Sequence, residues 1–202
     1  MPPLPRLLIT LGDVAGIGPE IVARAWPDLC THAHPVVVGD PLWLERGLAL
    51  AALSARVVPV ATVEEVEPTP DVMPCLRATQ QDLSAVRVGE VSAAAGRAAY
   101  DWLCRAIDET LAGRAGGIVT APLHKESLHA AGYPWPGPTE LLAEAAASTD
   151  VAMMFVGGGL RVALLTIHRS LRSVPDAVTR EQLLRVARLL RRELPRFGAQ
   201  RA

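Results

Sequence analysis

The sequence predicts an α/β fold in which helices flank a mostly parallel or mixed β-sheet. Short apolar runs alternate with amphipathic segments along the chain, as they do in successive βα units. Turns that contain Gly or Pro separate these runs. Two strand candidates joined across residues 157–159, which are all glycine, predict a hairpin, and this hairpin favours a mixed sheet.

The first predicted unit is a strand, a Gly-rich turn and a helix. The apolar run Leu7–Leu11 predicts a buried strand that ends at a turn over residues 12–18. Pro19 and Glu20 suit a first helical turn, because Pro lacks the amide hydrogen that has no partner there and Glu complements the helix dipole. Such a turn either presents amide groups to an anion or needs its glycines only for backbone geometry, and both interpretations stay open. The glycine spacing fits neither the Rossmann fingerprint nor the P-loop.

The rest of the chain continues the alternation. Beyond a helix over residues 21–26, strands are expected at 36–38, 55–60, 117–120, 151–155 and 161–166, and helices at 42–53, 92–112, 124–131, 139–147 and 179–192. Ser92 and Thr139 are the expected N-caps of two of these helices. Residues 62–81 are rich in Pro, Glu and Asp and show little periodicity, so we expect an exposed connection there.

Composition limits the classes of partner. The net charge of −1 and the 4% of aromatic residues argue against a nucleic-acid partner, and no apolar run approaches the length of about 20 residues that a membrane span needs. Three widely spaced cysteines, Cys30, Cys75 and Cys104, are typical of reduced thiols rather than of a disulfide framework or a zinc site. We therefore expect a cytoplasmic protein of one or two domains.

Two neighbouring residues are candidates for chemistry at the end of a predicted strand. His124 and Lys125 follow the strand over residues 117–120, and open α/β sheets bind ligands at the carboxyl ends of their strands. Lys125 is the only lysine in the chain and could hold a phosphate or carboxylate, while His124 could bind or transfer a proton. The alternative is a solvated lysine beside a histidine that only begins a helix.

His168 is a second candidate, because it follows the predicted strand at 161–166. A histidine in this place can act as a metal ligand or general base, although an isolated one is more often structural, and no second His or Cys stands at ligand spacing. Asp13 and Glu20 could act as acid or base groups, with turn and capping roles as the simpler interpretation.

Four blocks of sequence carry a family resemblance when they are taken together. They are Ile9–Glu20 (ITLGDVAGIGPE), Thr120–Lys125 (TAPLHK), Gly137–Glu140 (GPTE) and Arg161–His168 (RVALLTIH). Their order and spacing across nearly the whole chain resemble the 4-hydroxythreonine-4-phosphate dehydrogenase family of pyridoxal phosphate biosynthesis. This combination is specific, whereas each block alone would not be.

The resemblance implies a fold and a reaction. The fold is a two-domain subunit like that of the isocitrate and isopropylmalate dehydrogenases, incomplete here at its C-terminus. A first domain is expected at 1–118, and the start of a second domain for substrate and metal at 119–202. The enzymes of this family are homodimers that oxidise a small phosphorylated hydroxy-amino acid with NAD, after which the product decarboxylates. A divalent metal (zinc, magnesium or cobalt) held by three histidines polarises the substrate hydroxyl.

The resemblance carries over to only some of the site residues. His168 matches the first of the three metal histidines, and Thr139 matches a threonine that contacts substrate. Pro138 replaces a substrate-contacting histidine, so that contact is lost. The other two metal histidines of the family lie further downstream than Ala202, and we therefore expect the 202-residue chain by itself to be inactive.

Other functions remain open at this point. The chain could be a non-catalytic family remnant or an anion-binding module, or it could act on another phosphorylated hydroxy acid or on a cyclic dihydrodiol. If later strands complete the sheet, this chain exposes an apolar strand edge and is expected to self-associate.

Overall fold

The computed structural model describes residues 3–135, 137–147 and 150–197, and it contains the expected alternation of strands and helices. The chain divides into two compact units, Met1–Ala146 and Ala147–Ala202. The domain boundary expected between residues 118 and 119 falls inside the first unit, within a strand of its sheet. How these units relate to the domains of a longer protein stays a prediction.

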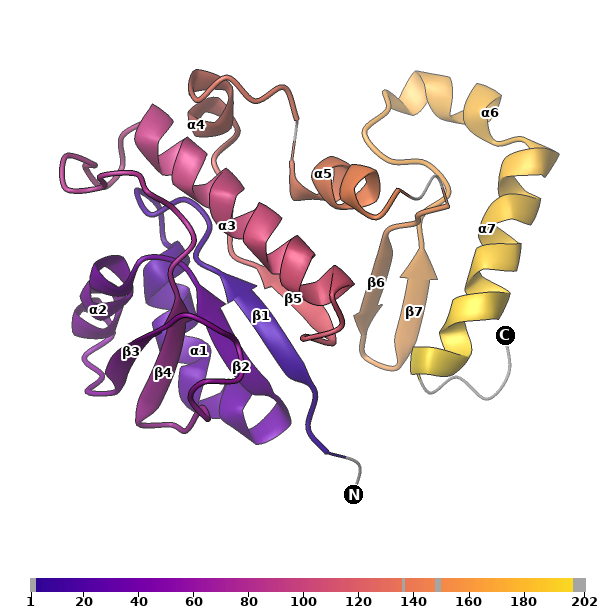
Figure 1. Ribbon diagram of the computed structural model, residues 1–202. Helices are drawn as coiled ribbons and strands as arrows, with labels where there is room; N and C mark the ends of the chain where they lie inside the picture. Colours follow the sequence, from indigo (N-terminus) through magenta and orange to yellow (C-terminus); the bar gives the residue numbers. More distant parts are fainter. Residues whose placement is uncertain (1–2, 136, 148–149, 198–202) are drawn as a thin grey trace. The chain divides into compact units, whose positions relative to one another are not determined.

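The first unit is built on a five-stranded, wholly parallel sheet in the order β3-β4-β2-β1-β5 (Figure 1). The strands are β1 (Arg6–Thr10), β2 (His34–Val38), β3 (Arg56–Val60), β4 (Val72–Leu76) and β5 (Gly117–Thr120). The helices are α1 (Gly18–His32), α2 (Pro41–Leu50), α3 (Ala93–Leu111), α4 (Lys125–Ala130) and α5 (Pro138–Ala145). The structure thus confirms the α/β fold with a mostly parallel sheet.

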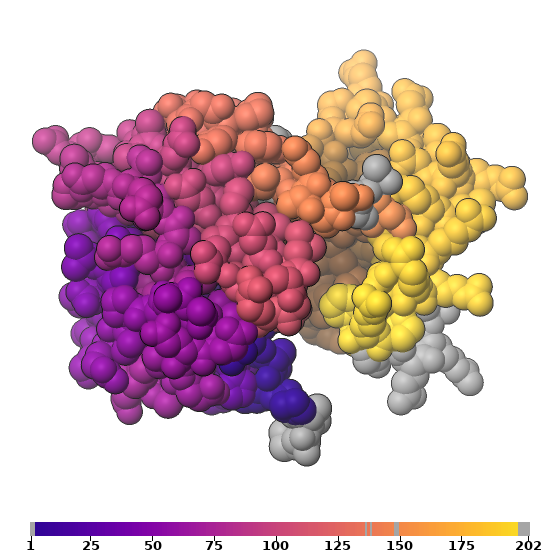
Figure 2. Space-filling view, in the orientation of Figure 1, coloured from indigo at the N-terminus to yellow at the C-terminus, as the bar shows by residue number. Residues whose placement is uncertain are grey.

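Helices cover both faces of this sheet. α1 and α2 pack together on one face, and α3 packs against β1, β2 and β5 on the other (Figure 1). In the space-filling view, α3 and its neighbours hide most of the sheet on that side (Figure 2). Val37 of β2 is fully buried, and Trp26 of α1 and Trp102 of α3 are fully buried in the same hydrophobic core. Such burial of continuous apolar strands is expected for a parallel sheet covered on both faces.

β4 corrects the expectation that residues 62–81 form an exposed connection. It lies between β3 and β2, and Met73 and Cys75 at its centre are fully buried. Pro74 and the absence of a polar–apolar alternation concealed this strand in the sequence. The ladder between β2 and β4 contains only two residue pairs, at Cys75 and Leu76, so that Pro74 lies beyond it. On the other side of β4, Pro74 lies within the five-pair ladder with β3, opposite Val58, so the sheet accommodates a proline in a buried strand.

Of the two N-caps predicted from the sequence, the structure confirms Ser92 but not Thr139. The Ser92 side chain accepts a hydrogen bond from the Ala95 amide, as expected for an N-cap. α5 instead begins at Pro138 with Gly137 as its N-cap, so Thr139 lies inside the first turn. The helix begins earlier than expected because a proline is well suited to a first helical position.

The second unit combines a hairpin with a long amphipathic helix. β6 (Met154–Gly157) and β7 (Leu160–Ala163) pair antiparallel, which confirms the expected hairpin. Gly158 and Gly159 both adopt positive φ, the geometry that a tight two-residue hairpin turn requires. The long helix is α7 (Arg180–Glu193). Two short helical segments, η1 (Leu171–Ser173) and α6 (Val174–Ala177), precede it in the chain, and a further short one, η2 (Leu194–Phe197), follows it. The hairpin forms its own sheet, separate from the parallel one.

Two general features bear on function. Among the residues that the structure describes, no helix has the length and apolar character that crossing a membrane requires. All three cysteines are free, and burial raises the pKa of the Cys75 thiol far above its ordinary value. A thiol of this kind is chemically inert in the folded protein.

Candidate functional site

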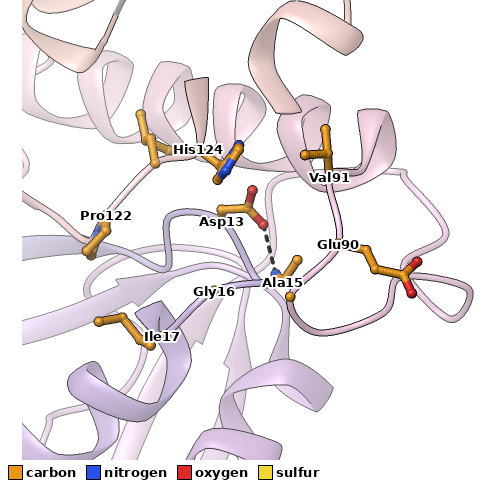
Figure 3. A pocket seen from close by; sticks show the side chains of 10 residues that line it. Asp13, Ala15, Gly16, Ile17, Glu90, Val91, Pro122 and His124 are labelled. Carbon is orange, nitrogen blue, oxygen red and sulfur yellow. Dashed lines mark hydrogen bonds between the residues drawn. The ribbon is translucent and has the colours of Figure 1, made fainter. Parts of the chain in front are cut away.

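A pocket lies where the order of the strands reverses. From β1 the chain continues to β2 on one side, whereas after β4 it passes through α3 to β5 on the other side of β1. Open parallel sheets bind ligands beyond the carboxyl ends of their strands at such a switch point. The pocket has a volume of about 280 Å³ and is lined by residues 13–17 after β1, 89–91 before α3 and 122–124 after β5 (Figure 3).

Backbone hydrogen bonds hold the three lining segments together. The Asp13 amide donates to the Pro122 carbonyl at 2.9 Å, and this bond joins the turn after β1 to the loop after β5. The Gly89 amide donates to the Ala15 carbonyl at 2.7 Å and fixes the third segment. The ITLGDVAGIGPE and TAPLHK blocks are about a hundred residues apart in the sequence, and both line this one pocket.

Two glycines of the turn are needed for the fold. Gly12 has a φ of +66°, and a Cβ added there would lie 2.3 Å from the Pro122 oxygen. A Cβ added at Gly18 would lie 2.0 Å from the Leu11 oxygen, so α1 could not pack so closely against the end of β1. At these two positions, glycine is needed for backbone geometry and close packing, as the structural interpretation of the Gly-rich turn predicts.

Gly16 differs from these two glycines. Its backbone is not left-handed, and the nearest atom to an added Cβ, the Asp13 carbonyl oxygen, would be 3.4 Å away, an ordinary contact. Gly16 is exposed and lines the pocket. The packing of this chain therefore does not explain the absence of a side chain at this position.

Asp13 is the most buried polar group of the pocket. Its residue is only 4% exposed, and its Oδ1 accepts a hydrogen bond from the Ala15 amide at 2.8 Å (Figure 3). Within the part of the chain that the structure describes, Oδ2 has no hydrogen-bond partner. Glu90 adds a second acidic side chain to the lining. Two carboxyl groups disfavour an anion here, so the anion-binding interpretation of this turn stays a prediction without support from the lining charges.

His124 faces the same pocket from the loop after β5. It is the N-cap of α4, and its Nδ1 accepts a hydrogen bond from the Ser127 amide at 3.4 Å. Because an accepting ring nitrogen carries no proton, the proton of the neutral imidazole lies on Nε2, which can donate to a ligand. Lys125, the next residue, is exposed and does not line the pocket.

Thr139 lies in the same unit but does not line this pocket. It is half-buried in the first turn of α5, next to Pro138, whose side chain is outside the description. The segment before α5 is held by a stack in which the Tyr100 and Tyr133 rings lie 3.8 Å apart. Trp135 stacks beside Tyr100, and its Nε1 donates to Glu144 of α5 at 2.8 Å. Aromatic packing therefore holds in place the segment that leads into α5.

His168 lies in the second unit, beyond β7. It is exposed and has a φ of +54°, an uncommon conformation for a residue with a side chain. Among the residues that the structure describes, no three His, Cys, Asp or Glu side chains could hold a metal ion together. His168 is thus one candidate ligand, and the described residues do not by themselves fit a divalent-metal site with three protein ligands.

The third lining segment was not anticipated. Residues 89–91 belong to no predicted element, yet Gly89 and Glu90 close one side of the pocket. The only signal in the sequence was the dipeptide Gly89-Glu90 before a predicted helix, and Gly89 indeed has a φ of +83°. Sequence spacing cannot show that this turn reaches the loop after β1.

A family model described as "Pyridoxal phosphate biosynthetic protein PdxA" matches residues 31–202. The chain belongs to this family. It is 39% identical over 195 residues to the 4-hydroxythreonine-4-phosphate dehydrogenase of Geobacter metallireducens, a match that covers 96% of this chain and 58% of the relative. The corresponding enzyme of Beijerinckia indica is 43% identical over 165 residues, which is 82% of this chain and 49% of the relative. The chain thus spans about half the length of these curated relatives.

Solved structures agree with this assignment. The 4-hydroxythreonine-4-phosphate dehydrogenase of Klebsiella pneumoniae matches with a TM-score of 0.89 and 35% identity, over 98% of this chain and 60% of that one. A terephthalate 1,2-cis-dihydrodiol dehydrogenase of Burkholderia xenovorans matches with a TM-score of 0.65 and 24% identity, over 98% of this chain and 59% of that one. The second likeness shows the shared fold alone.

Proposed function

We propose that this chain forms part of an NAD-dependent, divalent-metal-dependent dehydrogenase of pyridoxal phosphate biosynthesis. The substrate would be 4-phosphooxy-L-threonine, which is oxidised and then decarboxylated. Support comes from the family membership and from the names of the relatives. The observation that carries the proposal is the pocket at the switch point, because two of the family-like sequence blocks meet there.

The proposed roles follow the resemblance. Thr139 would hydrogen-bond the substrate, and His168 would supply one of three histidine ligands. When bound, the metal would supply Lewis-acid activation of the hydroxyl, and NAD would accept the hydride. His124 would donate or accept a proton in the pocket, and the exposed Lys125 would attract the negatively charged substrate. A cytoplasmic homodimer is part of the same proposal.

A chimera tests this function directly. Residues 1–202 are joined to the C-terminal part of the Geobacter metallireducens relative, and NADH formation from 4-phosphooxy-L-threonine is followed with zinc, magnesium or cobalt. We expect activity from the chimera and none from the 202-residue chain. In the chimera, His168→Ala should reduce the rate by about a hundredfold or more, beyond the range seen for groups that only support a ligand.

The matched control is His129→Ala, because His129 is exposed in the last turn of α4 and lies outside the pocket. This variant should keep the activity of the chimera. A chimera that unfolds cooperatively and yet forms no NADH with any of the three metals would overturn the proposal, and NADH formation by the chain alone would overturn the expected inactivity.

A second candidate function rests on Pro138. Proline has no side-chain donor, so a substrate that needs a histidine contact at this position would bind poorly. The enzyme would then act on another phosphorylated hydroxy acid or on a cyclic dihydrodiol. In the chimera, Pro138→His should improve kcat/KM for 4-phosphooxy-L-threonine if that compound is not the native substrate. Unchanged kcat/KM would remove the reason for this alternative.

A further inference from the structure

A second hydrophobic cluster, apart from the main core, holds α5 against α3 (Figure 1). Leu103 and Ile107 of α3 and Leu141 of α5 are the buried members of this α3–α5 cluster. α5 has only eight residues, and its N-cap, Gly137, has no side chain that could accept from the first-turn amides. A helix this short is not stable by itself, so the position of α5 depends on its packing against α3.

Three aromatic side chains extend the α3–α5 cluster to the segment before α5. Tyr100 of α3 stacks on Tyr133 with ring centroids 3.8 Å apart, and Trp135 stacks beside Tyr100 at 5.5 Å. The guanidinium of Arg97, also in α3, lies 5.3 Å from the centre of the Tyr133 ring. Both tyrosines of the chain take part, although aromatic residues are only 4% of the sequence. The stacked rings and the cation–π contact fix this segment against α3.

Trp135 also ties the segment to the far end of α5. Its Nε1 donates at 2.8 Å to Oε2 of Glu144, which lies in the last turn of the helix. This hydrogen bond therefore bridges residues 135–144. Thr139 lies inside the bridged stretch, between the aromatic stack and the buried Leu141. The backbone of Thr139 is thus held from both sides by contacts with α3.

The contacts of Trp135 differ from those of the main core. Trp26 and Trp102 of the main core are fully buried, whereas Trp135 and Tyr100 are half-buried and the hydrogen bond to Glu144 is exposed. Regions with few buried contacts open at a lower free energy than the whole protein. We therefore expect α5 to open and close locally while the parallel sheet stays folded.

We propose that Trp135 is a positioning residue, which fixes Thr139 by holding α5 against α3. It acts through its stack on Tyr100 and its hydrogen bond to Glu144. Its effect on substrate binding rests on the proposed function, in which Thr139 contacts the substrate. Only molecules with α5 in place can then bind substrate, so loss of the Trp135 contacts raises KM. kcat is kept, because every molecule that has bound substrate has α5 in place.

Amide hydrogen exchange of the 202-residue chain, resolved by residue, measures the opening of α5. In the wild type, the α5 amides should exchange faster than those of the central strands β1 and β2. Glu144→Ala removes the acceptor and should make the exchange of α5 about two- to tenfold faster, the change expected for one hydrogen bond. Glu144→Gln keeps an acceptor oxygen and should restore the slow exchange. The matched control is Glu126→Ala at an exposed position in α4, which should leave the exchange of α5 unchanged.

The chimera with the Geobacter metallireducens relative measures the effect on substrate. Trp135→Ala removes both the stack and the hydrogen bond, and it should raise KM for 4-phosphooxy-L-threonine by about threefold or more with kcat unchanged. Trp135→Phe keeps a ring that can stack and loses only the N–H donor, so its KM should lie between those of the wild type and Trp135→Ala. A residue that only stabilised the fold would not separate KM from kcat in this way.

The outcomes separate this inference from the proposed function. Equal exchange of α5 and the central strands in the wild type, or equal exchange of α5 in the wild type and Glu144→Ala, overturns the positioning role. An unchanged KM in an active chimera that carries Trp135→Ala overturns it as well. Faster exchange in Glu144→Ala with recovery in Glu144→Gln supports the role even if the chimera forms no NADH, a result that would remove only the dehydrogenase assignment.

Discussion

Replacing Gly12 by alanine is expected to destabilise the first unit by about 2–3 kcal/mol. The left-handed backbone at φ +66° costs a residue with a side chain about 1–2 kcal/mol. The added Cβ would also stand 2.3 Å from the Pro122 oxygen, so the loop after β5 must move and weaken the hydrogen bond from the Asp13 amide, worth about 0.5–1.5 kcal/mol. Alanine also lowers the conformational entropy of the unfolded chain, which stabilises the folded protein by about 0.4–1 kcal/mol. This gain is smaller than the two costs together with the steric strain.

Urea unfolding measures this effect, with the fluorescence of Trp26 and Trp102 reporting on the core because both side chains are fully buried. At a typical slope of about 1–3 kcal/mol per molar urea, the midpoint should fall by about 0.7–3 M. The matched control is Gly16→Ala in the same turn, where an added Cβ meets only an ordinary contact at 3.4 Å. That variant should be unchanged or more stable by up to about 1 kcal/mol.

The reasoning fails if Gly12→Ala unfolds at the wild-type midpoint, or if Gly16→Ala loses as much stability as Gly12→Ala. Either result would mean that the turn relaxes freely and does not fix the distance between β1 and β5. The pocket walls would then not be rigid.

Three further predictions concern the same unit. Met73→Ala should cost about 2–5 kcal/mol of unfolding free energy in urea, because Met73 is fully buried in β4, whereas a residue in an exposed connection would cost little. Glu109 is 3% exposed and pairs with Arg114 and Arg105, and its hydrogen bond with Arg114, followed by the charges of both arginines, lowers its pKa. Glu109→Gln should therefore cost about 1–3 kcal/mol at neutral pH. The lowered pKa means that ionised Glu109 stabilises the fold at pH values above its ordinary pKa of 4.5, and that this contribution is lost as the pH falls through the pKa of the folded protein. The difference in unfolding free energy between wild type and Glu109→Gln should therefore vanish at low pH, which urea titrations at several pH values would show. Cys75 should resist a thiol reagent until the protein unfolds, and rapid labelling of Cys75 in the native state would contradict its burial.

The elements that the sequence predicted correctly have strong local signals. β1, β2 and β5 are short apolar runs between turn residues, and α3 begins at Ser92 with a side-chain cap. The family resemblance likewise depended on contiguous blocks of sequence, and the family match agrees with it. Local propensity and contiguous motifs can be recognised without knowing which segments touch.

The sequence was misleading or silent where contacts between distant residues decide the structure. β4 is a strand because β2 and β3 flank it, although Pro74 argues against one. α5 begins at Pro138 rather than after Thr139, because the proline favours the first helical position.

By itself, the sequence determined the α/β class, most of the strands and helices, the family and the candidate side chains. Only the tertiary structure decided that Asp13 and His124 line one pocket with residues 89–91, because strand order, and not sequence distance, brings the turns after β1 and β5 together. It also distinguished Gly12, which the fold needs, from Gly16, which it does not. These distinctions depend on which atoms lie within a few ångströms of one another, and only the folded chain sets those distances.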